Sequence, residues 1–232
     1  MNAPNTVDLR DTPQRMNDAS TTLTLFIDAF WISPYVFSCF VALREKGLDF
    51  SVEPVALQSK AQDEPAYRDG TITGRVPALR HGDFWLAESQ AIIEYLDDAF
   101  PDAPRVLPRG TQERARARQI LAWVRSDLMP IRDERPTSTM FYERAEAPLS
   151  DAGNAAVAKL LRVADLLVPQ DSSSLFGAWS QADSDLAFML HRLLLNGHEV
   201  PAKIRAYAER EWQRPSVQEF VKRERAPYVP YV

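Results

Sequence analysis

The sequence predicts an α/β domain over residues 21–100, followed by an all-helical domain over residues 110–232. In the first part, short apolar runs alternate with segments of helical pattern, whereas in the second part apolar residues recur only at helical spacing. Between the two, residues 101–109 contain three prolines within a polar composition, which is typical of a linker.

The first half of the predicted α/β domain is a strand, a helix and a second strand. Residues 24–27 form a short apolar run before a Ser-Pro step, and Val36, Phe40 and Leu43 then follow at helical spacing. Residues 50–55 alternate as a second strand. Because a helix connects the two strands, we expect a right-handed crossover and parallel pairing.

The second half of this domain is predicted to be two short strands and a helix. Residues 56–74 are polar and irregular in pattern. Residues 78–80 and 84–86 are short apolar runs on either side of a His-Gly-Asp turn, which indicates a hairpin. A helix then opens at Ser89 and ends near Phe100.

The second domain is predicted to be helical because three stripes of apolar residues recur at spacings of three and four. The stripes are Ile120, Val124, Leu128 and Ile131; Val157, Leu161, Ala164 and Val168; and Leu186, Leu190, Leu193 and Leu194. Pro130 is expected to kink or end the first of these helices. Ser180, with Asp183 three residues later, predicts a capping box at the start of a buried helix.

The N-terminal residues are expected to lie outside both domains. Residues 1–20 are rich in Asn, Asp, Thr, Pro and Arg and lack the apolar run of a signal peptide, so we expect a mobile tail. Met16 is an alternative start to Met1, and the sequence leaves this choice open.

Composition argues against several classes of function. The 232-residue chain carries a formal net charge of −5, which argues against nucleic-acid binding, and no run approaches the roughly 18 apolar residues of a membrane span. Cys39 is the only cysteine, so no intrachain disulfide is expected and a reduced cytoplasm is the predicted location. The histidines, His81, His191 and His198, are scattered, and we expect no metal site.

Two neighbouring segments predict a binding site for a short peptide. Pro77 cannot donate to a sheet ladder, so the Val76-Pro77 step belongs at the edge or start of a strand, where it suggests a cis bond. Val76 is then able to pair its N–H and C=O with an extended peptide. Ser89 opens a helix whose first amides point outward and favour a carboxylate. One short peptide is expected to satisfy both.

A third segment places hydroxyl groups at the start of the first helix. Ser33 is predicted to be its N-cap, with Pro34 at the first helical position. The positive end of the helix dipole lies at this point and favours a negatively charged ligand. Tyr35 offers a second hydroxyl, and we favour Ser33. Cys39 lies further along the same helix and is expected to be buried and inert.

Taken together, these segments resemble the glutathione transferase superfamily. The Val76-Pro77, Glu88-Ser89 and Ser180-x-x-Asp183 steps occur in the order that this family shows. Three longer runs are similar to the bacterial YfcF-like glutathione transferases: Ser-Pro-Tyr-Val at 33–36, Arg-Ala-Arg-Ala-Arg-Gln-Ile at 114–120 and Ser-Asp-Leu-Met-Pro-Ile-Arg at 126–132. The resemblance covers nearly the whole chain beyond the tail. It implies a thioredoxin-like first domain and an all-helical second domain.

The resemblance also implies glutathione as cosubstrate and roles for particular residues. Val76 and Pro77 are expected to hold the cysteinyl backbone of glutathione. Glu88 and Ser89 are expected to hold its γ-glutamyl end. Ser33 is the expected catalytic residue, whose hydroxyl donates to the glutathione sulfur and favours the thiolate.

The remaining implied contacts are less closely tied to a motif. Lys60 or Arg75 is expected to meet the glycyl carboxylate of glutathione, and Met129 or Arg132 the second substrate. Members of this family usually pair as homodimers, which the resemblance implies for this chain as well. The physiological electrophile is not specified by any of these residues.

The expected function is therefore a glutathione transferase for detoxification, which activates the thiol for attack on an electrophile or a peroxide. Ser33 and Val36 replace the two cysteines of related thiol oxidoreductases, so disulfide exchange through a mixed disulfide is not expected. The alternative is a non-catalytic glutathione-binding regulatory or assembly protein, which the presence of Ser33 disfavours. A third option, maleylacetoacetate isomerase, would have a Ser-Ser-Cys-Ser run where residues 31–34 read Trp-Ile-Ser-Pro.

Overall fold

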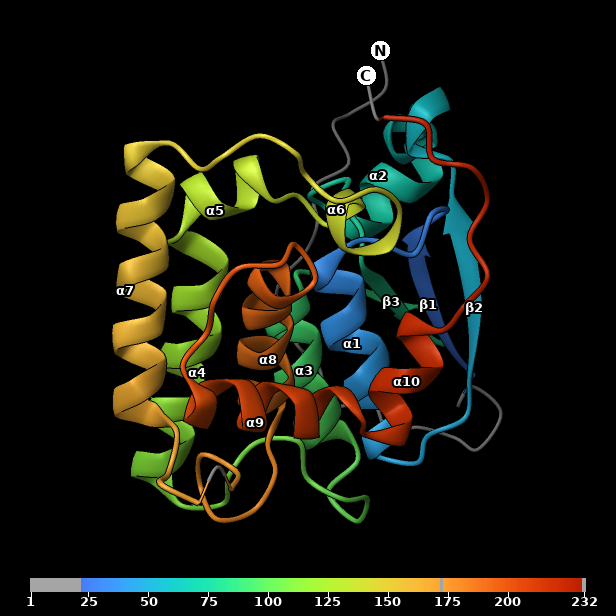
Figure 1. Cartoon of the computed structure of the whole chain (residues 1–232). Helices are drawn as coiled ribbons and strands as arrows, with labels where there is room; N and C mark the ends of the chain where they lie inside the picture. Colours follow the sequence, from blue (N-terminus) through green and yellow to red (C-terminus); the bar gives the residue numbers. More distant parts are fainter. Residues whose placement is uncertain (1–21, 172, 231–232) are drawn as a thin grey trace.

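The computed structural model describes residues 22–171 and 173–230 of the chain (Figure 1). A mixed sheet with its helices lies beside a larger group of helices. The predicted fold class, an α/β thioredoxin-like domain followed by an all-helical domain, is confirmed. The predicted tail, residues 1–20, lies outside the described residues, as do both candidate start positions, Met1 and Met16.

The sheet has the strand order β2-β1-β3-β4. Its strands are β1 (Leu23–Asp28), β2 (Phe50–Val55), β3 (Ala78–His81) and β4 (Phe84–Ala87). The parallel pairing of β1 with β2 is confirmed, and β3 runs antiparallel to both β1 and β4. The hairpin turn is shorter than predicted, because His81 pairs with Phe84 inside the ladder. Gly82, with φ of 59°, supplies the left-handed conformation that a two-residue turn needs.

The first domain contains α-helices, which begin at a proline or a serine, and short 3₁₀ turns. They are α1 (Pro34–Glu45), the 3₁₀ turns η1 (Leu57–Ser59) and η2 (Ala61–Asp63), α2 (Pro65–Thr71) and α3 (Ser89–Ala99). The predicted apolar positions Val36, Phe40 and Leu43 of α1 are all buried. α1 contacts β1 and α3 in its own domain and α8 and α10 in the other, so it joins the two domains.

A buried ion pair fixes the end of α1 to α3 and to the segment that follows it. Lys46 is 2% exposed, and its Nζ lies 3.0 Å from the carboxylate of Asp97. The same Nζ donates to the carbonyl groups of Phe100 and Pro104. Because both charges are paired and hydrogen-bonded, their burial is tolerated. Residues 100–110, which contain no helix or strand, are thereby held against the first domain.

The second domain is helical, as predicted. Its helices in the described residues are α4 (Thr111–Ser126), α5 (Met129–Glu134), α6 (Ser138–Phe141), α7 (Asp151–Leu167), α8 (Gln181–Leu194), α9 (Ala202–Trp212) and α10 (Pro215–Val221). The expected break before Pro130 is confirmed, since Leu128 adopts φ of 61° between α4 and α5. The predicted capping box also forms, because the carboxylate of Asp183 accepts from the N–H and hydroxyl of Ser180.

The apolar stripe predicted on α7 is confirmed in its second half and displaced by one residue in its first half. Ala164 and Val168 are buried as predicted, whereas Val157 and Leu161 are only half-buried and the preceding residues, Ala156 and Leu160, are buried instead. α7 lies at the outer edge of the molecule, where it contacts α5 and α9 (Figure 1). A helix covered on one side buries only a narrow face, and here alanines allow its close approach.

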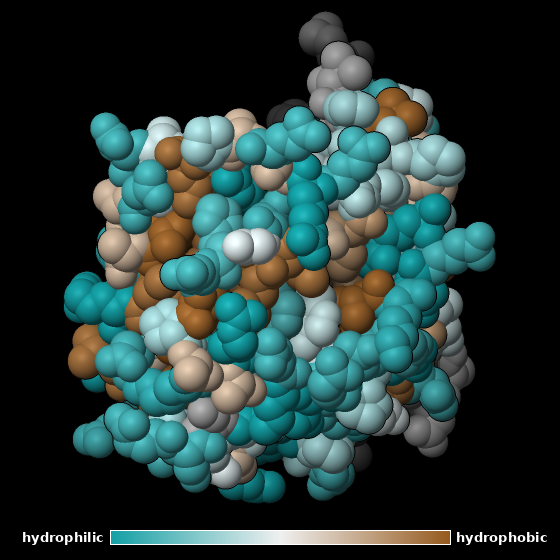
Figure 2. All heavy atoms as spheres, viewed as in Figure 1, coloured by the Kyte–Doolittle hydropathy of each residue, from teal (hydrophilic) through white to brown (hydrophobic). Residues whose placement is uncertain are grey.

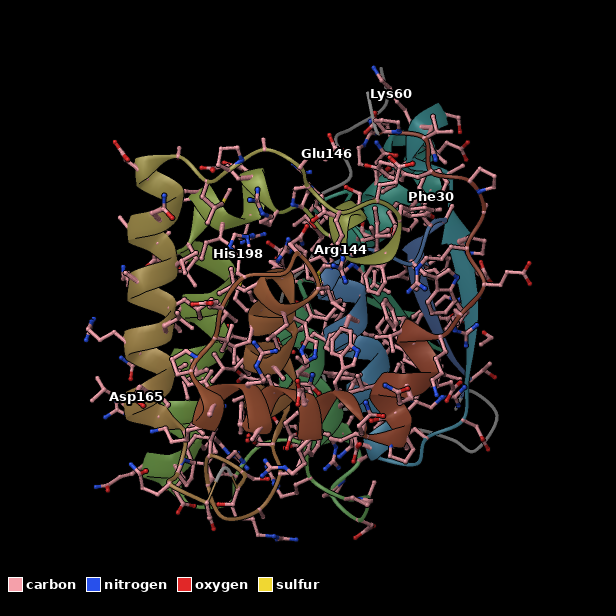
Figure 3. The ribbon with its side chains drawn as sticks, viewed as in Figure 1. Phe30, Lys60, Arg144, Glu146, Asp165 and His198 are labelled. Atoms are coloured by element: carbon pink, nitrogen blue, oxygen red, sulfur yellow. The ribbon has the colours of Figure 1, made fainter. Side chains whose placement is uncertain are left out.

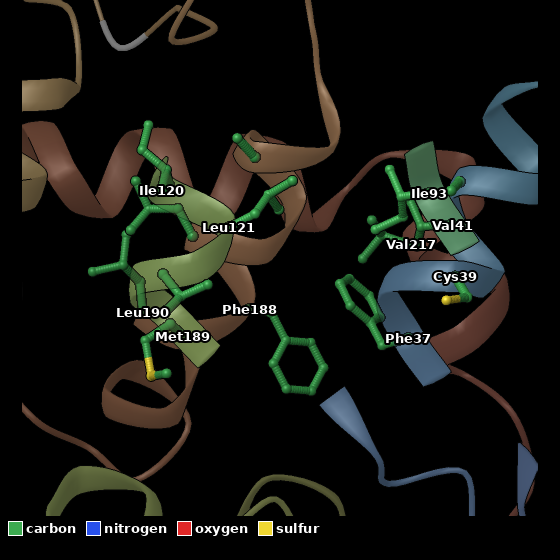
Figure 4. Close-up of a cluster of buried hydrophobic side chains, with 14 of the residues drawn as sticks. Phe37, Cys39, Val41, Ile93, Ile120, Leu121, Phe188, Met189, Leu190 and Val217 are labelled. Carbon is green, nitrogen blue, oxygen red and sulfur yellow. The ribbon is translucent and has the colours of Figure 1, made fainter. Parts of the chain in front are cut away.

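One continuous hydrophobic core crosses the boundary between the domains. Phe37 of α1 and Phe188 of α8 meet with their ring centroids 4.4 Å apart (Figure 4). Phe37 also contacts Phe220 of α10, 5.3 Å away, in an edge-on arrangement. Aromatic contacts of this kind add to the burial of apolar area. The shared core therefore fixes the cleft that lies between the two domains.

The face of the molecule that Figure 2 shows is mostly hydrophilic at its rim, and hydrophobic residues gather in its centre. Within the residues that the structure describes, no helix has the length and apolar character needed to span a membrane.

Candidate functional site

A cleft of about 750 Å³, here called the larger pocket, opens between the first domain and the end of α4. Val76 and Pro77 line it from the segment before β3, and Glu88 and Ser89 line it from the start of α3. Tyr35 adds its side chain from the first turn of α1. The structure therefore brings the four predicted peptide-binding residues together in one cleft.

A second pocket of about 340 Å³ adjoins the first. Tyr35 and Val76 line both, so the two are neighbours. Ser33 lines only this second pocket, together with Met129 and Arg132 of α5. The predicted catalytic hydroxyl thus lies on the side where the second substrate was expected.

The loop that carries Ser33 is held by a buried carboxylate. Asp28, at the end of β1, accepts from the backbone N–H of Ile32 at 2.8 Å and of Ser33 at 3.1 Å. The Ser33 hydroxyl oxygen accepts in turn from the N–H of Val36 at 3.3 Å, which makes it the predicted N-cap of α1. Because this hydroxyl acts as an acceptor toward the helix, its proton is left to donate to a ligand.

Val76 offers main-chain groups to the cleft. The Val76-Pro77 bond is cis, as predicted, and β3 begins one residue later. Within residues 22–171 and 173–230, neither the N–H nor the C=O of Val76 makes a hydrogen bond. The preceding carbonyl, of Arg75, accepts from the buried hydroxyl of Tyr67 at 2.8 Å. The segment is therefore fixed while the groups needed to pair with an extended peptide remain available.

Glu88 and Ser89 form the start of α3. The backbone of Glu88 has a conformation that residues other than glycine rarely adopt. Glu88 has φ of 68° and ψ of 110°, and its side chain is exposed. Strained backbone of this kind in a cleft points to a functional role. Ser89 is 5% exposed, and its hydroxyl accepts from Nε of Arg125 at 3.0 Å. The first amides of α3 and the serine proton together favour a carboxylate at this point.

Arg125, at the end of α4, connects this site to the second domain. Its guanidinium donates to the Ser38 hydroxyl at 2.9 Å and lies 2.8 Å from the carboxylate of Asp185 on α8. Asp185 also accepts from the hydroxyl of Ser38. Arg125 also lines the larger pocket. A cation from the helical domain therefore donates a hydrogen bond to Ser89 at the edge of that pocket.

Sequence reasoning missed two arginines, Arg125 and Arg192. Arg192 is 3% exposed on α8 and lines the second pocket. Its position between Leu190 and Leu193 of a predicted apolar stripe was a detectable signal, because arginine is rarely buried without a partner. Arg125 follows the buried Val124 in the same way.

The two candidates for a glycyl carboxylate are placed differently. Lys60 is exposed, adopts φ of 59° between η1 and η2, and lines neither pocket. Figure 3 shows its side chain at the outer tip of the first domain, pointing away from the ribbon. Arg75 and Gln62 line the larger pocket. The structure therefore brings Arg75, and not Lys60, to the cleft.

Cys39 is buried, as expected. Its sulfur lies 3.7 Å from the carbonyl oxygen of Ser89, and burial raises the pKa of its thiol. A thiol that stays protonated is a poor nucleophile. Among the described residues, no group of three or more His, Cys, Asp or Glu side chains is arranged to hold a metal ion.

Comparison with known families assigns both parts of the chain. Residues 32–99 match the family described as "Glutathione S-transferase, N-terminal domain", and residues 110–225 match "Glutathione S-transferase, C-terminal domain". The thioredoxin-like domain and the helical domain of the structure correspond to these two matched regions. The chain belongs to the glutathione S-transferase family.

Individual relatives agree with this assignment. The chain is 42% identical to a solved glutathione transferase homolog from Burkholderia GL BGR1 with bound glutathione, with a TM-score of 0.72 over 87% of this chain and 97% of the other. It is 38% identical to glutathione S-transferase U28 of Arabidopsis thaliana and 35% identical to glutathione S-transferase 1 of Dianthus caryophyllus. These two alignments cover 38% and 50% of this chain and span 39% and 52% of the plant proteins.

Proposed function

We propose that this protein is a glutathione transferase, in which glutathione occupies the larger pocket and an electrophile or peroxide the second. One observation carries the proposal: the unpaired main chain of Val76, the start of α3 and the Ser33 hydroxyl surround two adjoining pockets. The glutathione bound to the Burkholderia relative supports the choice of ligand.

In the proposed complex, the cysteinyl unit of glutathione pairs with the main chain of Val76 as a short added strand. The γ-glutamyl carboxylate takes the first amides of α3 and the hydroxyl of Ser89, while Glu88 meets the γ-glutamyl ammonium. Arg75 is assigned to the glycyl carboxylate, because it lines the pocket and Lys60 does not. In this arrangement the thiol of glutathione points toward the boundary between the pockets, where Tyr35 and Ser33 lie.

Ser33 is assigned to the sulfur because its proton is available and the positive end of α1 lies beside it. A free thiol has a pKa of about 8.5, and lowering it by one unit requires about 1.4 kcal/mol of preference for the thiolate. One hydroxyl donor and the dipole of α1 are sufficient for a shift of this size. Tyr35 is the second candidate, since it lines both pockets.

The thiolate then acts as the nucleophile. With an aryl halide, its electron pair forms the carbon–sulfur bond, and halide leaves with the pair of the broken bond. With an organic peroxide, the thiolate attacks one oxygen, and an alcohol is released. A second glutathione then reduces the resulting sulfenic acid, which gives glutathione disulfide and water. Family membership and the position of Ser33 favour this enzyme over a non-catalytic binding protein.

Three finer assignments accompany this proposal. The runs at 33–36, 114–120 and 126–132, and the bacterial relative, support a place among the YfcF-like enzymes. Members of this family usually form homodimers, which supports a homodimer for this protein. The lone buried cysteine needs no oxidising compartment, which supports a cytoplasmic location.

The test is calorimetric titration with reduced glutathione, followed by rate measurements with aryl halides, organic peroxides and disulfides. We expect saturable binding and turnover of the first two classes. Binding without turnover of any substrate would favour the non-catalytic alternative. Absence of binding would contradict the proposal as a whole.

A further inference from the structure

The second pocket contains a buried guanidinium that forms no ion pair with any acidic residue that the structure describes. Arg192 is 3% exposed, and its Nη1 donates to the carbonyl oxygen of Arg135 at 2.8 Å. Its Nε is buried and makes no hydrogen bond, and in the described part of the chain no carboxylate forms an ion pair with it. Burying an unpaired charge costs stability, so such a residue is kept where a ligand supplies the partner.

A second cation lines the same pocket. The guanidinium of Arg132 donates to the hydroxyl of Tyr35 and to the carbonyl oxygen of Arg125, which are both uncharged groups. Burial, together with the nearby charge of Arg132, lowers the pKa of Arg192 to about 10, which leaves Arg192 charged at neutral pH. Two like charges therefore converge on one pocket of about 340 Å³.

The acidic residues nearby do not balance this charge. Asp185 is engaged by Arg125, and Asp28 accepts from the amides of the Ser33 loop. Asp133 lines the pocket but is exposed, and it forms no ion pair with either arginine in the described residues. The pocket accordingly presents a net positive wall formed by Arg132 and Arg192.

We propose that the second pocket is specific for electrophiles that carry a carboxylate, which Arg192 and Arg132 bind together. A guanidinium matches the planar carboxylate with two parallel donors, and a desolvated site strengthens the pairing. The carboxylate lies at the α8 side of the pocket and the electrophilic carbon at the Ser33 side. This inference rests on the proposed function for the reaction, but the binding preference is measurable without turnover.

The binding test uses unreactive probes of equal shape, 3-nitrobenzoate and 3-nitrobenzamide. Calorimetric titrations are performed with the larger pocket saturated by S-methylglutathione, so that neither probe enters it. We expect the benzoate to bind at least about tenfold tighter than the amide, and Arg192→Met to remove the difference. Arg116→Met removes a charge from the exposed face of α4 outside both pockets, and it should keep the preference.

Equal affinity for the two probes, or a preference that survives both Arg192→Met and Arg132→Gln, would overturn the proposal. Arg132→Gln also covers the case in which Arg192→Met does not fold. If S-methylglutathione fails to bind, the titrations are repeated without it; a benzoate preference that depends on Arg192 would then sustain this inference while the proposed function falls.

Turnover and stability provide independent readouts. Rates with 4-chloro-3-nitrobenzoate and 4-chloro-3-nitrobenzamide are each divided by their uncatalysed rates with glutathione, and we expect the acceleration to be at least about tenfold larger for the benzoate. The Tm of Arg192→Met should equal or exceed that of the parent, because an unpaired charge has been removed. A lower Tm, with unchanged probe selectivity, would mean that Arg192 is structural.

Discussion

The two pockets differ in the kind of group that they present to a ligand. The larger pocket offers main-chain groups from Val76 and the start of α3, in addition to side chains such as those of Ser89 and Arg75. The second pocket offers side chains from α1, α5, α6 and α8, among them Tyr35, Arg132 and Arg192. Main-chain groups persist through substitution, whereas side chains change with it. The larger pocket is thus suited to a ligand recognised in part through its own peptide groups, and the second pocket to a ligand recognised by side chains.

Arg125 is the strongest test of this comparison, because it contacts Ser89 in the larger pocket from the helical domain. Arg125→Met leaves Asp185 buried without its cation, which should lower the free energy of unfolding by about 3–5 kcal/mol. It also removes the donor behind Ser89, so glutathione affinity should fall by about tenfold. Chemical denaturation and calorimetry measure the two effects separately.

Two companion variants separate charge burial from ligand support. Arg118→Met removes an arginine of the same helix whose partner, Glu94, is partly exposed, and should change stability by less than about 1 kcal/mol. Combining Arg125→Met with Asp185→Asn should recover stability but not affinity for glutathione. Recovery of both would show that Arg125 does not assist the pocket.

Ser33 tests the boundary between the pockets. Ser33→Ala should raise the pKa of bound glutathione and slow turnover of an aryl halide by about 100-fold, since one donor to the developing thiolate is lost. Glutathione affinity should stay within a few-fold, because the main-chain contacts remain. Ultraviolet titration of the bound thiolate and steady-state rates measure these quantities.

Ser33→Thr is the matched control, since it keeps both the hydroxyl and the N-cap, and it should retain most of the activity. Unchanged rates in Ser33→Ala, with a loss in Tyr35→Phe, would transfer the role to Tyr35. Because Tyr35 lines both pockets, that outcome would also place the sulfur deeper between them.

The contrast between the pockets also explains how much the sequence could predict. Val76-Pro77 and Ser89 lie at the starts of elements whose positions follow from local patterns, so these parts of the larger pocket could be predicted from short motifs, whereas Arg125, which also lines it, could not. The parallel pairing of β1 and β2 and the capping box at Ser180 were predictable for the same reason. Each of these features depends on residues close together in the chain.

The second pocket was predicted only in part, through Ser33, Met129 and Arg132, and the place of Arg192 in it could not be predicted because it depends on how distant helices pack. Arg192 and Tyr35 are 157 positions apart in the chain, and no local pattern places α8 beside α1. The displaced positions in the first half of α7 have the same cause, because the contacts with neighbouring helices determine which face of α7 is buried. Lys60 lies in an irregular stretch where spacing predicts no direction for a side chain, and the structure places it outside both pockets.

Glu88 tests whether the larger pocket needs a side-chain charge in addition to its main-chain groups. Glu88→Gln keeps the size of the side chain but removes its charge, and should weaken glutathione binding by about tenfold. Asp98→Asn makes the same change at an exposed position of α3 outside both pockets and should have no effect. Equal affinities in calorimetry would show that the γ-glutamyl end binds elsewhere.

Lys60 should give the smallest effect and completes the comparison. Its ammonium is exposed and outside the lining of both pockets, so Lys60→Ala should change glutathione affinity by less than about twofold. Arg75→Ala, which removes a cation that does line the larger pocket, should weaken binding several-fold. Titrations at low and high salt distinguish a direct contact from a general effect of charge, because only exposed charges are strongly screened. If Lys60→Ala instead weakens binding more than Arg75→Ala at both salt concentrations, the segment between β2 and α2 must fold over glutathione when it binds, and Lys60 would then be the residue that meets the glycyl carboxylate.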